Sequence, residues 1–443
     1  MMRSMYSGVS GLRIHQTRMD VIGNNIANVN TTGFKSGRVT FNEIFSQTLQ
    51  GASGASESIG GRNPMQVGLG ANISSIDTLM TEGAAQRTDN PLDMKIEGDG
   101  FFIVKDGGGF KFTRAGAFRL DEVGNLCNPE GLNVMGWRTD PTTGNIVKDK
   151  VNSIKILSPE NMYSDPSMTK NATVSGNIQK NDPNLDSAKG VYRQVPIYDS
   201  LGYKYTVDLK ICQTATANEF DIRIMANSLK DKDGNKIGSA SNPIPATDAN
   251  KTATFDVNTG KVVSSAADGS DTRLELTLGA TTTGFSKFST PIKIDFSNLT
   301  LFDGKTTVEA VGGDEDGLGA GAPAGKLSSF EIGTDGKILG KYSNSKTKIL
   351  GQIAVANFQN PAGLQKVGNN LFQVTSNSGE FDGIGKEVTE DGGSLNGGVL
   401  EMSNVDLSRE FTDMITTQRG FQANSRIITA SDEMLQELVN LKR

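Results

Sequence analysis

The stretch SNVDLSREFTDMITTQRGFQANSRIITASDEMLQELVNLKR, residues 403–443, carries an unbroken heptad repeat of large apolar residues. The residues spaced by seven are Leu407, Met414, Phe421, Ile428 and Leu435, and the stripe is widened by Phe411, Leu438 and Val439. Such a repeat places one apolar seam along a helix and predicts a partner helix. Ser403 and Asp406 are spaced like a capping box, so we expect the helix to begin there and to extend about 60 Å.

A weaker stripe lies at the other end of the chain and predicts a helix over residues 4–30. Its apolar members are Met5, Leu12, Met19, Ile22, Ile26 and Val29. Three glycines in this segment each cost about 1 kcal/mol relative to Ala, so we expect the helix to fold only on meeting a partner. Because the two stripes lie at opposite chain ends, we predict an antiparallel coiled coil in which residues 19–29 face residues 421–438.

The first helix runs into GNNIANVNTTGFK, residues 23–35. Asn24, Asn25 and Asn28 are polar positions beside the apolar stripe. Gly33 is a candidate for the left-handed residue that ends a helix. Phe34 and Lys35 then begin the connection to the next part of the chain.

The composition favours a multidomain, mainly β protein. Gly makes up 52 of 443 residues and aromatic residues only 6%, so the chain has many turns and few large anchors. Its length is typical of two to four domains. The net charge of −6 has no basic cluster and argues against nucleic-acid binding. No apolar run is long enough to span a membrane, and the N-terminal segment lacks the apolar core of a Sec signal peptide.

Alternating strand patterns lie between the helices, and their order predicts nested domains, with each outer layer built from two distant segments. Turns at EGDGFF, DGGGF, Asp199–Gly202 and Asp335-Gly336 are expected to join these strands. We predict a helical domain from residues 1–35 and 400–443, a Gly/Ser-rich connection at 36–70, a first β domain from 71–149 and 327–399, and an inserted β domain at 150–326. The Gly-rich stretches 51–70 and 304–326 are expected to be flexible.

The residues that catalysis would need are missing from recognisable settings. His15 is the single histidine and lies on the helix stripe. No nucleophile motif, phosphate loop or metal-ligand spacing is present, so we expect no enzyme, cofactor or metal site. Cys127 and Cys212 lie far apart in unrelated contexts and are expected to be unpaired or buried. A secreted adhesin or carbohydrate-binding module remains an alternative, although it predicts clustered exposed aromatic residues.

The sequence resembles the bacterial flagellar axial proteins, a family of rod, hook and hook-associated subunits. The likeness rests on SGLRIHQTRMDVIGNNIANVNTTGFKSG, on NPLDMKIEGDGFFIVKD with FTRAGAFRLDEVGNL, and on residues 397–443. The long insert containing VPIYDSLGYKYTVDL and the segment 349–380 resemble hook subunits most. The long segment 36–70 would also suit a distal rod subunit, and residues 213–326 have no counterpart that we can identify.

This resemblance implies a structural subunit that polymerises with itself into a curved hollow tube, which transmits torque from the rod to the filament. It implies as partners the distal rod, the hook cap, the hook-filament junction proteins and the flagellar export apparatus, with export unfolded and without a Sec signal. It also leaves open a covalent cross-link between subunits through a Cys and a Lys. In such a polymer, we expect the Asn side chains of residues 23–35 to bind the next subunit.

Overall fold

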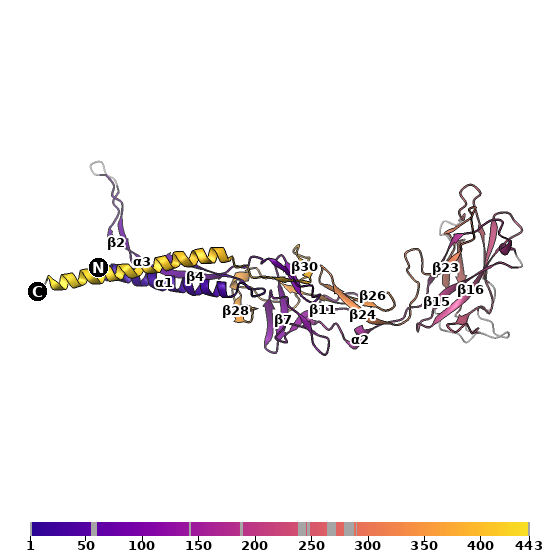
Figure 1. Ribbon diagram of the computed structural model, residues 1–443, viewed down its shortest axis with the longest axis horizontal. Helices are drawn as coiled ribbons and strands as arrows, with labels where there is room; N and C mark the ends of the chain where they lie inside the picture. The colour runs from indigo at the N-terminus through magenta and orange to yellow at the C-terminus, as the bar shows by residue number, and fades with distance from the viewer. Residues whose placement is uncertain are drawn as a thin grey trace. The chain divides into compact units, whose positions relative to one another are not determined.

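The computed structural model describes residues 2–54, 60–140, 143–186, 189–237, 245, 249–263, 272–278, 288 and 290–441. The chain divides into two compact units. The first unit contains residues 1–158, 330–340 and 348–443, and the second contains residues 159–329 and 341–347. The fold is mainly β, with the N-terminal and C-terminal helices packed against each other, which confirms the predicted fold class (Figure 1).

The first unit contains the two long helices and most of the short strands. Its helices are α1 (Met2–Ala27) and α3 (Leu407–Asn440). Its strands are β1 (Gly37–Glu43), β2 (Ser46–Gln50), β3 (Met65–Gly68), β4 (Ala71–Thr78), β5 (Ala85–Arg87), β6 (Met94–Glu97), β7 (Phe101–Asp106), β8 (Gly109–Thr113), β9 (Arg119–Leu120), β10 (Leu126–Cys127), β11 (Asn133–Arg138), β12 (Asn152–Ser153), β27 (Val355–Ala356), β28 (Gln365–Gly368), β29 (Leu371–Gln373), β30 (Ser394–Gly397) and β31 (Val399–Glu401). A unit boundary falls within β24 (Gly325–Ile332), β25 (Lys337–Tyr342) and β26 (Thr347–Ile353).

The core of the first unit is an aromatic cluster built from both halves of the chain. Phe101 and Phe112 come from the hairpin β7–β8, and Phe358 and Phe372 come from the segment before α3. The rings meet edge to face, with centroids 4.8 Å apart for Phe112 and Phe358, a favourable geometry for aromatic pairs. The sheet order β26-β11-β7-β8-β29-β28 therefore joins residues 101–138 to residues 347–373.

The second unit is a sandwich of two five-stranded sheets. One sheet contains β14 (Asn171–Asn177), β20 (Arg273–Leu276), β21 (Ile292–Asp295), β22 (Leu299–Thr300) and β23 (Glu309–Gly312). The other contains β15 (Val191–Tyr198), β16 (Lys204–Gln213), β17 (Glu219–Ile224), β18 (Lys230–Asp231) and β19 (Ala249–Thr254). The short elements α2 (Pro159–Met162), β13 (Tyr163–Ser164) and a 3-10 turn (Pro183–Leu185) complete the unit. Alternate residues of both sheets form one buried cluster that includes Phe220 and Phe296, as expected for two sheets packed face to face.

Three of the four predicted turns close hairpins, whereas EGDGFF connects β6 to β7, which lie in different sheets. Tyr198 pairs with Lys204 across β15 and β16, and the carboxylate of Asp199 accepts hydrogen bonds from the backbone N–H groups of Leu201 and Tyr203. DGGGF closes the hairpin β7–β8. Gly336 follows Asp335 at a φ of +78°, a left-handed conformation that glycine adopts without strain.

Residues 304–326 differ from the flexible connection that we expected. They contain β23, which pairs with β14, and the backbone N–H of Gly313 donates to Asn171 O at 2.8 Å. The glycines at 313, 317, 319 and 321 have positive φ values and permit tight turns. A Gly-rich composition therefore reflects turn geometry here. The other expected connection, residues 51–70, also contains paired structure, because Ser53 pairs with Arg62 and β3 pairs with β2, while residues 55–59 lie outside the described residues.

We expect the two units to respond separately to a core substitution. Phe220 is fully buried in the second unit, so Phe220→Ala is expected to destabilise that unit by about 3–5 kcal/mol. The single tryptophan, Trp137, is buried in the core of the first unit. Its fluorescence should therefore report an unchanged urea midpoint while circular dichroism reports an earlier transition of the second unit.

The matched control is Phe302→Ala, because Phe302 is 51% exposed in the same unit and its removal leaves the core intact. An equal shift of the Trp137 midpoint in the Phe220 variant would contradict independent cores.

Candidate functional site: the paired terminal helices

The helices α1 and α3 pack side by side in antiparallel orientation (Figure 1). Ser4 Oγ lies 3.4 Å from Ser431 Oγ near one end of the pair. Near the other end, Asn25 Nδ2 donates to Glu410 Oε1 at 3.1 Å. Residues later in α1 therefore contact residues earlier in α3, so the predicted antiparallel orientation is correct.

Small residues line the contact between the two helices. A Cβ atom added to Gly8 would lie 3.2 Å from Ile428 Cγ1, and one added to Gly11 would lie 2.6 Å from Asn424 Nδ2. From the other helix, a Cβ atom on Gly420 would lie 2.7 Å from the imidazole of His15. Gly8 and Gly11, which we expected only to weaken the first helix, and Gly420 let the two helices approach closely within one chain.

The register of the pair differs from the predicted one. Arg18 Nη2 lies 3.0 Å from Asp413 Oδ1, so residues 19–29 lie opposite the first turns of α3 and not opposite residues 421–438. A heptad repeat fixes which face of a helix is apolar, but it permits several axial positions. The polar pairs at Arg18 and Asn25 and the close contacts at glycines select one position.

The predicted seam residues fall into three classes of burial. Ile22 is buried, whereas Met5, Leu12, Met19, Ile26, Val29, Met414, Ile428 and Leu435 are partly buried. Five of the predicted stripe residues on α3 remain exposed, and these are Leu407, Phe411, Phe421, Leu438 and Val439. The intramolecular contact therefore uses one part of the apolar surface and leaves another part accessible.

The N-terminus of α3 is capped by Asp406 and not by the expected pair of Ser403 and Asp406. The carboxylate of Asp406 accepts hydrogen bonds from the backbone N–H groups of Ser408 and Arg409, and the helix begins at Leu407. Ser403 Oγ instead accepts from Val405 N–H. An Asp cap satisfies two of the free N–H groups of the first turn and suits the positive end of the helix dipole. Residues 442–443 of the predicted helix lie outside the described residues.

Asn25 fixes the start of the β region against the helices. Its Nδ2 donates to Gly37 O and its Oδ1 accepts from Gly37 N–H, both at 2.9 Å. Its second amide hydrogen is directed to Glu410. Burial raises the pKa of Glu410, and this hydrogen bond opposes that rise. The expectation that these Asn side chains bind the next subunit is therefore wrong for Asn25. Asn28 likewise donates to Asn24 within the helix end.

Gly33 and Phe34 anchor the exit from α1. Gly33 has a φ of +69°, as predicted for a residue that ends a helix, and its N–H donates to Glu401 O at 2.8 Å. A Cβ atom here would lie 2.6 Å from Ala115 N, so a side chain would clash with the backbone. Phe34 is buried, and Lys366 Nζ lies 5.0 Å above its ring while also donating to Lys35 O.

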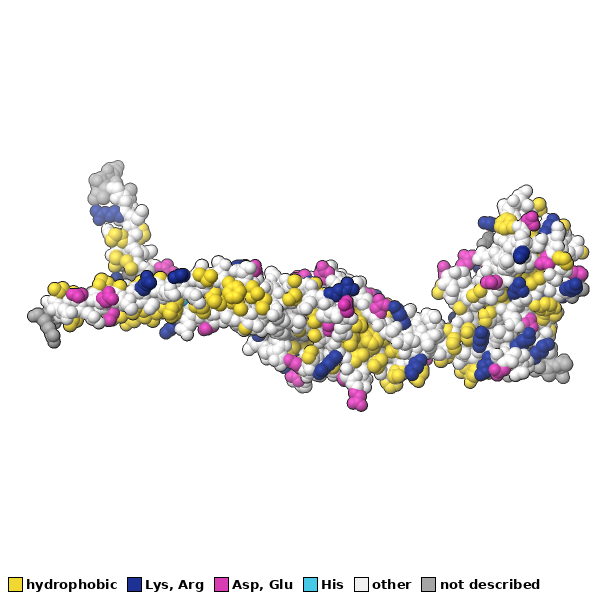
Figure 2. Space-filling view, viewed as in Figure 1, with side chains coloured by type: hydrophobic (Ala, Val, Ile, Leu, Met, Phe, Trp, Pro, Cys, Tyr) yellow, Lys and Arg dark blue, Asp and Glu magenta, His cyan; other side chains and the backbone are white. Residues whose placement is uncertain are grey.

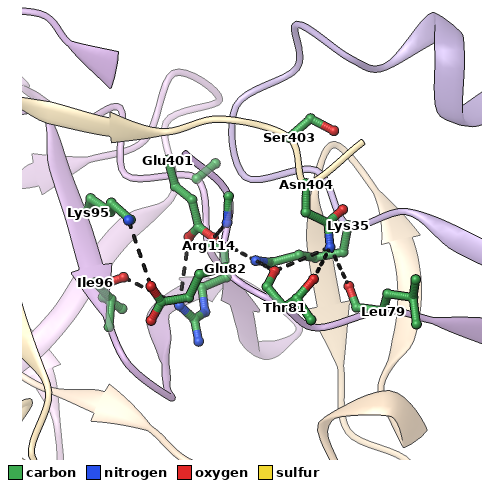
Figure 3. Close-up of polar contacts among 12 residues, drawn as sticks. Lys35, Leu79, Thr81, Glu82, Lys95, Ile96, Arg114, Glu401, Ser403 and Asn404 are labelled. Carbon is green, nitrogen blue, oxygen red and sulfur yellow. Dashed lines mark hydrogen bonds and ion pairs between the residues drawn. The ribbon is translucent and has the colours of Figure 1, made fainter. Parts of the chain in front are cut away.

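Lys35 enters a buried ionic cluster around Glu401 (Figure 3). Its Nζ lies 2.6 Å from Glu401 Oε1, and neither side chain is exposed to solvent. It also donates to Thr81 O at 2.7 Å. Burial lowers the pKa of Lys35, and the carboxylate of Glu401 opposes that shift. The amine is held by two acceptors, as a buried cation requires.

Arg114 approaches the same carboxylate from the β region. Its Nη1 lies 3.7 Å from Glu401 Oε2 and its Nη2 donates to Gly98 O at 2.9 Å. The guanidinium also lies 5.3 Å above the ring of Phe101. Gly83 N–H donates to Glu401 Oε1 at 3.0 Å. One carboxylate thus joins the end of α1, the β region and the segment that leads into α3.

Four family models match along the chain. They are described as Flagella basal body rod protein (residues 5–35), Flagellar hook protein FlgE/F/G D1 domain (95–176), Flagellar basal body protein FlaE D2 domain (165–317) and Flagellar basal body rod FlgEFG protein C-terminal (396–441). The flagellar hook protein FlgE of Borreliella burgdorferi is 40% identical, with all of both chains covered.

The chain belongs to the flagellar hook protein family. The hook protein FlgE of Treponema pallidum is 37% identical, again over the full length of both chains. The flagellar basal-body rod protein FlgG of Bacillus subtilis is 31% identical over the full length of both. These relatives place this hook-family chain in the flagellar basal body and hook.

The sequence did not identify Glu401, Arg114 or Lys366 as partners of the GFK segment. Glu401 lies beside the C-terminal helix, and a charged residue in a strand pattern is normally read as exposed. The only available signal was the position of Lys35, a cation placed directly after a predicted helix end and an aromatic residue.

Among the described residues, His, Cys, Asp and Glu form no cluster that could hold a metal. Cys127 and Cys212 are both buried free thiols. The helices of the described part of the chain are too short or too polar to cross a membrane.

We predict that Gly11→Leu and Gly23→Leu have opposite effects. Both residues lie in α1, but a Cβ atom at Gly23 has no atom within 4 Å. Leu should stabilise α1 at position 23 by up to about 1 kcal/mol, whereas at position 11 it displaces the side chain of Asn424 and disturbs the helix contact. Thermal unfolding followed by circular dichroism should show a higher helical midpoint for Gly23→Leu and a lower one for Gly11→Leu. Equal midpoints would argue against the close contact.

Glu401→Leu should be far more damaging than the loss of an exposed acid. It leaves Lys35 and Arg114 buried without an anion, which is expected to cost about 3–5 kcal/mol. Asp77→Asn breaks the exposed pair with Arg38 and should cost at most about 1 kcal/mol. Urea unfolding monitored by Trp137 fluorescence measures the loss of stability in both variants. Similar midpoints for the two variants would refute a structural role for the buried cluster.

Proposed function

We propose that this chain is a structural subunit of the bacterial flagellar hook, which polymerises through its terminal helices into a curved hollow tube. The tube would transmit torque from the rod to the filament. Membership of the hook family supports the identity of the polymer, and the exposed apolar surface of the helix pair is the observation that supports its assembly. The helical, connecting and two β domains that we assigned from the sequence are proposed as its working parts.

Large apolar side chains remain exposed on the helix pair after α1 and α3 have packed (Figure 2). On α3 they are Leu407, Phe411, Ile415, Phe421, Ile427, Met434, Leu438 and Val439, and on α1 they are Met2, Tyr6 and Val9. A surface of this kind marks a protein contact. Copies that use two different faces of the pair make a head-to-tail contact, and such contacts build a helical filament when they do not close into a ring.

The hairpin β2–β3 provides a second exposed apolar surface in the same unit. Among the strands that the structure describes, β2 and β3 pair only with each other. Leu49, Met65 and Val67 are exposed, as are Ile44 and Phe45 just before the hairpin. A two-stranded hairpin is marginally stable alone in water. Contact with a neighbouring subunit would bury these side chains and stabilise the hairpin.

Several partners follow from this function. The first subunits would contact the distal rod, growth would occur beneath a hook cap, and the last subunits would meet the hook-filament junction proteins. Delivery through the flagellar export apparatus would place the polymer outside the cell. A marginal α1 and the small number of cysteines suit a chain that travels unfolded and reduced.

Phe411→Ser with Ile415→Ser should abolish polymerisation without unfolding the subunit. Both side chains are exposed, so their loss removes apolar area from the assembly surface and leaves the contact with α1 intact. Sedimentation should show only subunits, with an unchanged Trp137 unfolding midpoint. Gln418→Ser, an exposed polar position of the same helix, is the control and should polymerise normally. Filaments formed by the double variant would refute assembly through this surface.

Deletion of residues 421–443 should also abolish polymerisation, because it removes half of the helix contact, while the β regions melt as before. Electron microscopy of the intact polymer separates the members of the family. A curved tube is expected for a hook subunit, whereas a straight tube would indicate a rod subunit.

A further inference from the structure

The single histidine of the chain lies in the contact between the two terminal helices. A Cβ atom built on Gly420 would lie 2.7 Å from Cε1 and Nε2 of His15 and 3.3 Å from its Nδ1. The ring therefore rests directly on the α3 backbone. Its Nδ1 is buried and has no hydrogen-bond partner among the described residues.

We propose that His15 makes the pairing of α1 and α3 sensitive to acid. The neutral imidazole fits against Gly420, whereas the imidazolium carries two N–H donors that both require an acceptor. Nδ1 has none in the paired state, and water reaches it only when the helices separate. Protonation of His15 thus favours unpaired helices, and with them the unassembled subunit, so this inference rests on the proposed assembly role.

The charges around His15 do not compensate for the added proton. Arg18, one turn further along α1, disfavours a second cation, and the carboxylate of Asp413 on α3 is bound to Arg18 at 3.0 Å. Arg419 on α3 is a further cation beside Gly420. The strands packed on α1 contribute Arg38 and Asp77, which pair with each other at 3.5 Å, and Glu43, which accepts a hydrogen bond from Ser46 Oγ.

The pKa of His15 agrees with this geometry, because burial and then the charge of Arg18 lower it below its usual value near 6.5. The unfolded chain then binds more protons than the paired chain at pH values between the lowered pKa and 6.5. Pairing is consequently strongest above pH 6.5 and weakens as the pH falls through that interval. Each unit of difference between the two pKa values changes the pairing equilibrium tenfold.

The helix pair is suited to respond to so small a change. The contact is lined by glycines and has buried polar groups such as Thr417, whose Oγ1 likewise lacks a partner among the described residues. Glu410 titrates in the opposite sense, because its raised pKa favours the folded state in acid. A variant at His15 is therefore needed to isolate the histidine.

The proposal is tested on the full chain as a soluble subunit, so its failure is distinct from a failure to polymerise. With isotope-labelled histidine, nuclear magnetic resonance gives a single imidazole titration. We expect a lower pKa in the folded chain than in the same chain in urea. Thermal unfolding of the helices between pH 7.5 and 5 should show a midpoint that decreases in the native chain as the pH is lowered, and this decrease should be absent in His15→Gln.

The matched control moves the histidine by one residue. Gln16 is exposed on α1, so the double variant His15→Gln with Gln16→His keeps the composition and places the imidazole in solvent. Its pH dependence should match that of His15→Gln. A folded pKa at or above the value in urea, or the same pH dependence in the native chain and His15→Gln, would overturn the proposal.

Discussion

The first unit depends on the ionic contacts that the carboxylate of Glu401 makes. The carboxylate neutralises Lys35, which is fully buried, and also faces Arg114, which is 4% exposed. Removing such charges from water costs several kcal/mol each, and only close contacts with good geometry repay that cost. The cluster therefore tolerates few arrangements of its three chain segments. This gives the joint between helices and strands a defined geometry, which a purely apolar contact would specify less strictly.

A second constraint comes from the topology, because both units are closed by segments that lie far apart in the sequence. The aromatic core of the first unit takes Phe101 from one half of the chain and Phe372 from the other. In the second unit, β14 pairs in parallel with β21 and β22, more than 100 residues later. Parallel pairing requires a crossover connection, and here the second sheet of the sandwich supplies it.

The sequence predicted those features that depend on periodicity or local turn chemistry. The two helices, their antiparallel pairing, the hairpin at Asp199 and the left-handed Gly33 all follow from patterns within one segment. The helix register did not, because it is selected by contacts such as Gly11 with Asn424 that no heptad specifies. The partner of Lys35 could not be found either, since burial of a charge is a property of the folded chain.

The glycines show the same distinction. At Gly8 and Gly11 a low helix propensity was recognised, but the reason for tolerating it was missed. Each of these glycines lowers the stability of its own helix and lets the two backbones lie close together. The second effect depends on where the opposite helix lies, so the sequence of one segment does not reveal it. The Gly-rich segment 304–326 was misread for a related reason, because composition alone does not separate a flexible chain from a series of tight turns.

The ion pair between Lys35 and Glu401 joins residues that are 366 positions apart. Closing so long a loop has a large entropic cost, and folds dominated by distant contacts form slowly. The sheets of the second unit, in contrast, close between residues 171 and 312. When the chain emerges from its N-terminus onward, the sandwich can therefore form before the C-terminal residues that complete the aromatic core and the helix pair have emerged. The connectivity therefore favours one order of folding, in which the inserted unit forms first and the contact between helices and strands forms last.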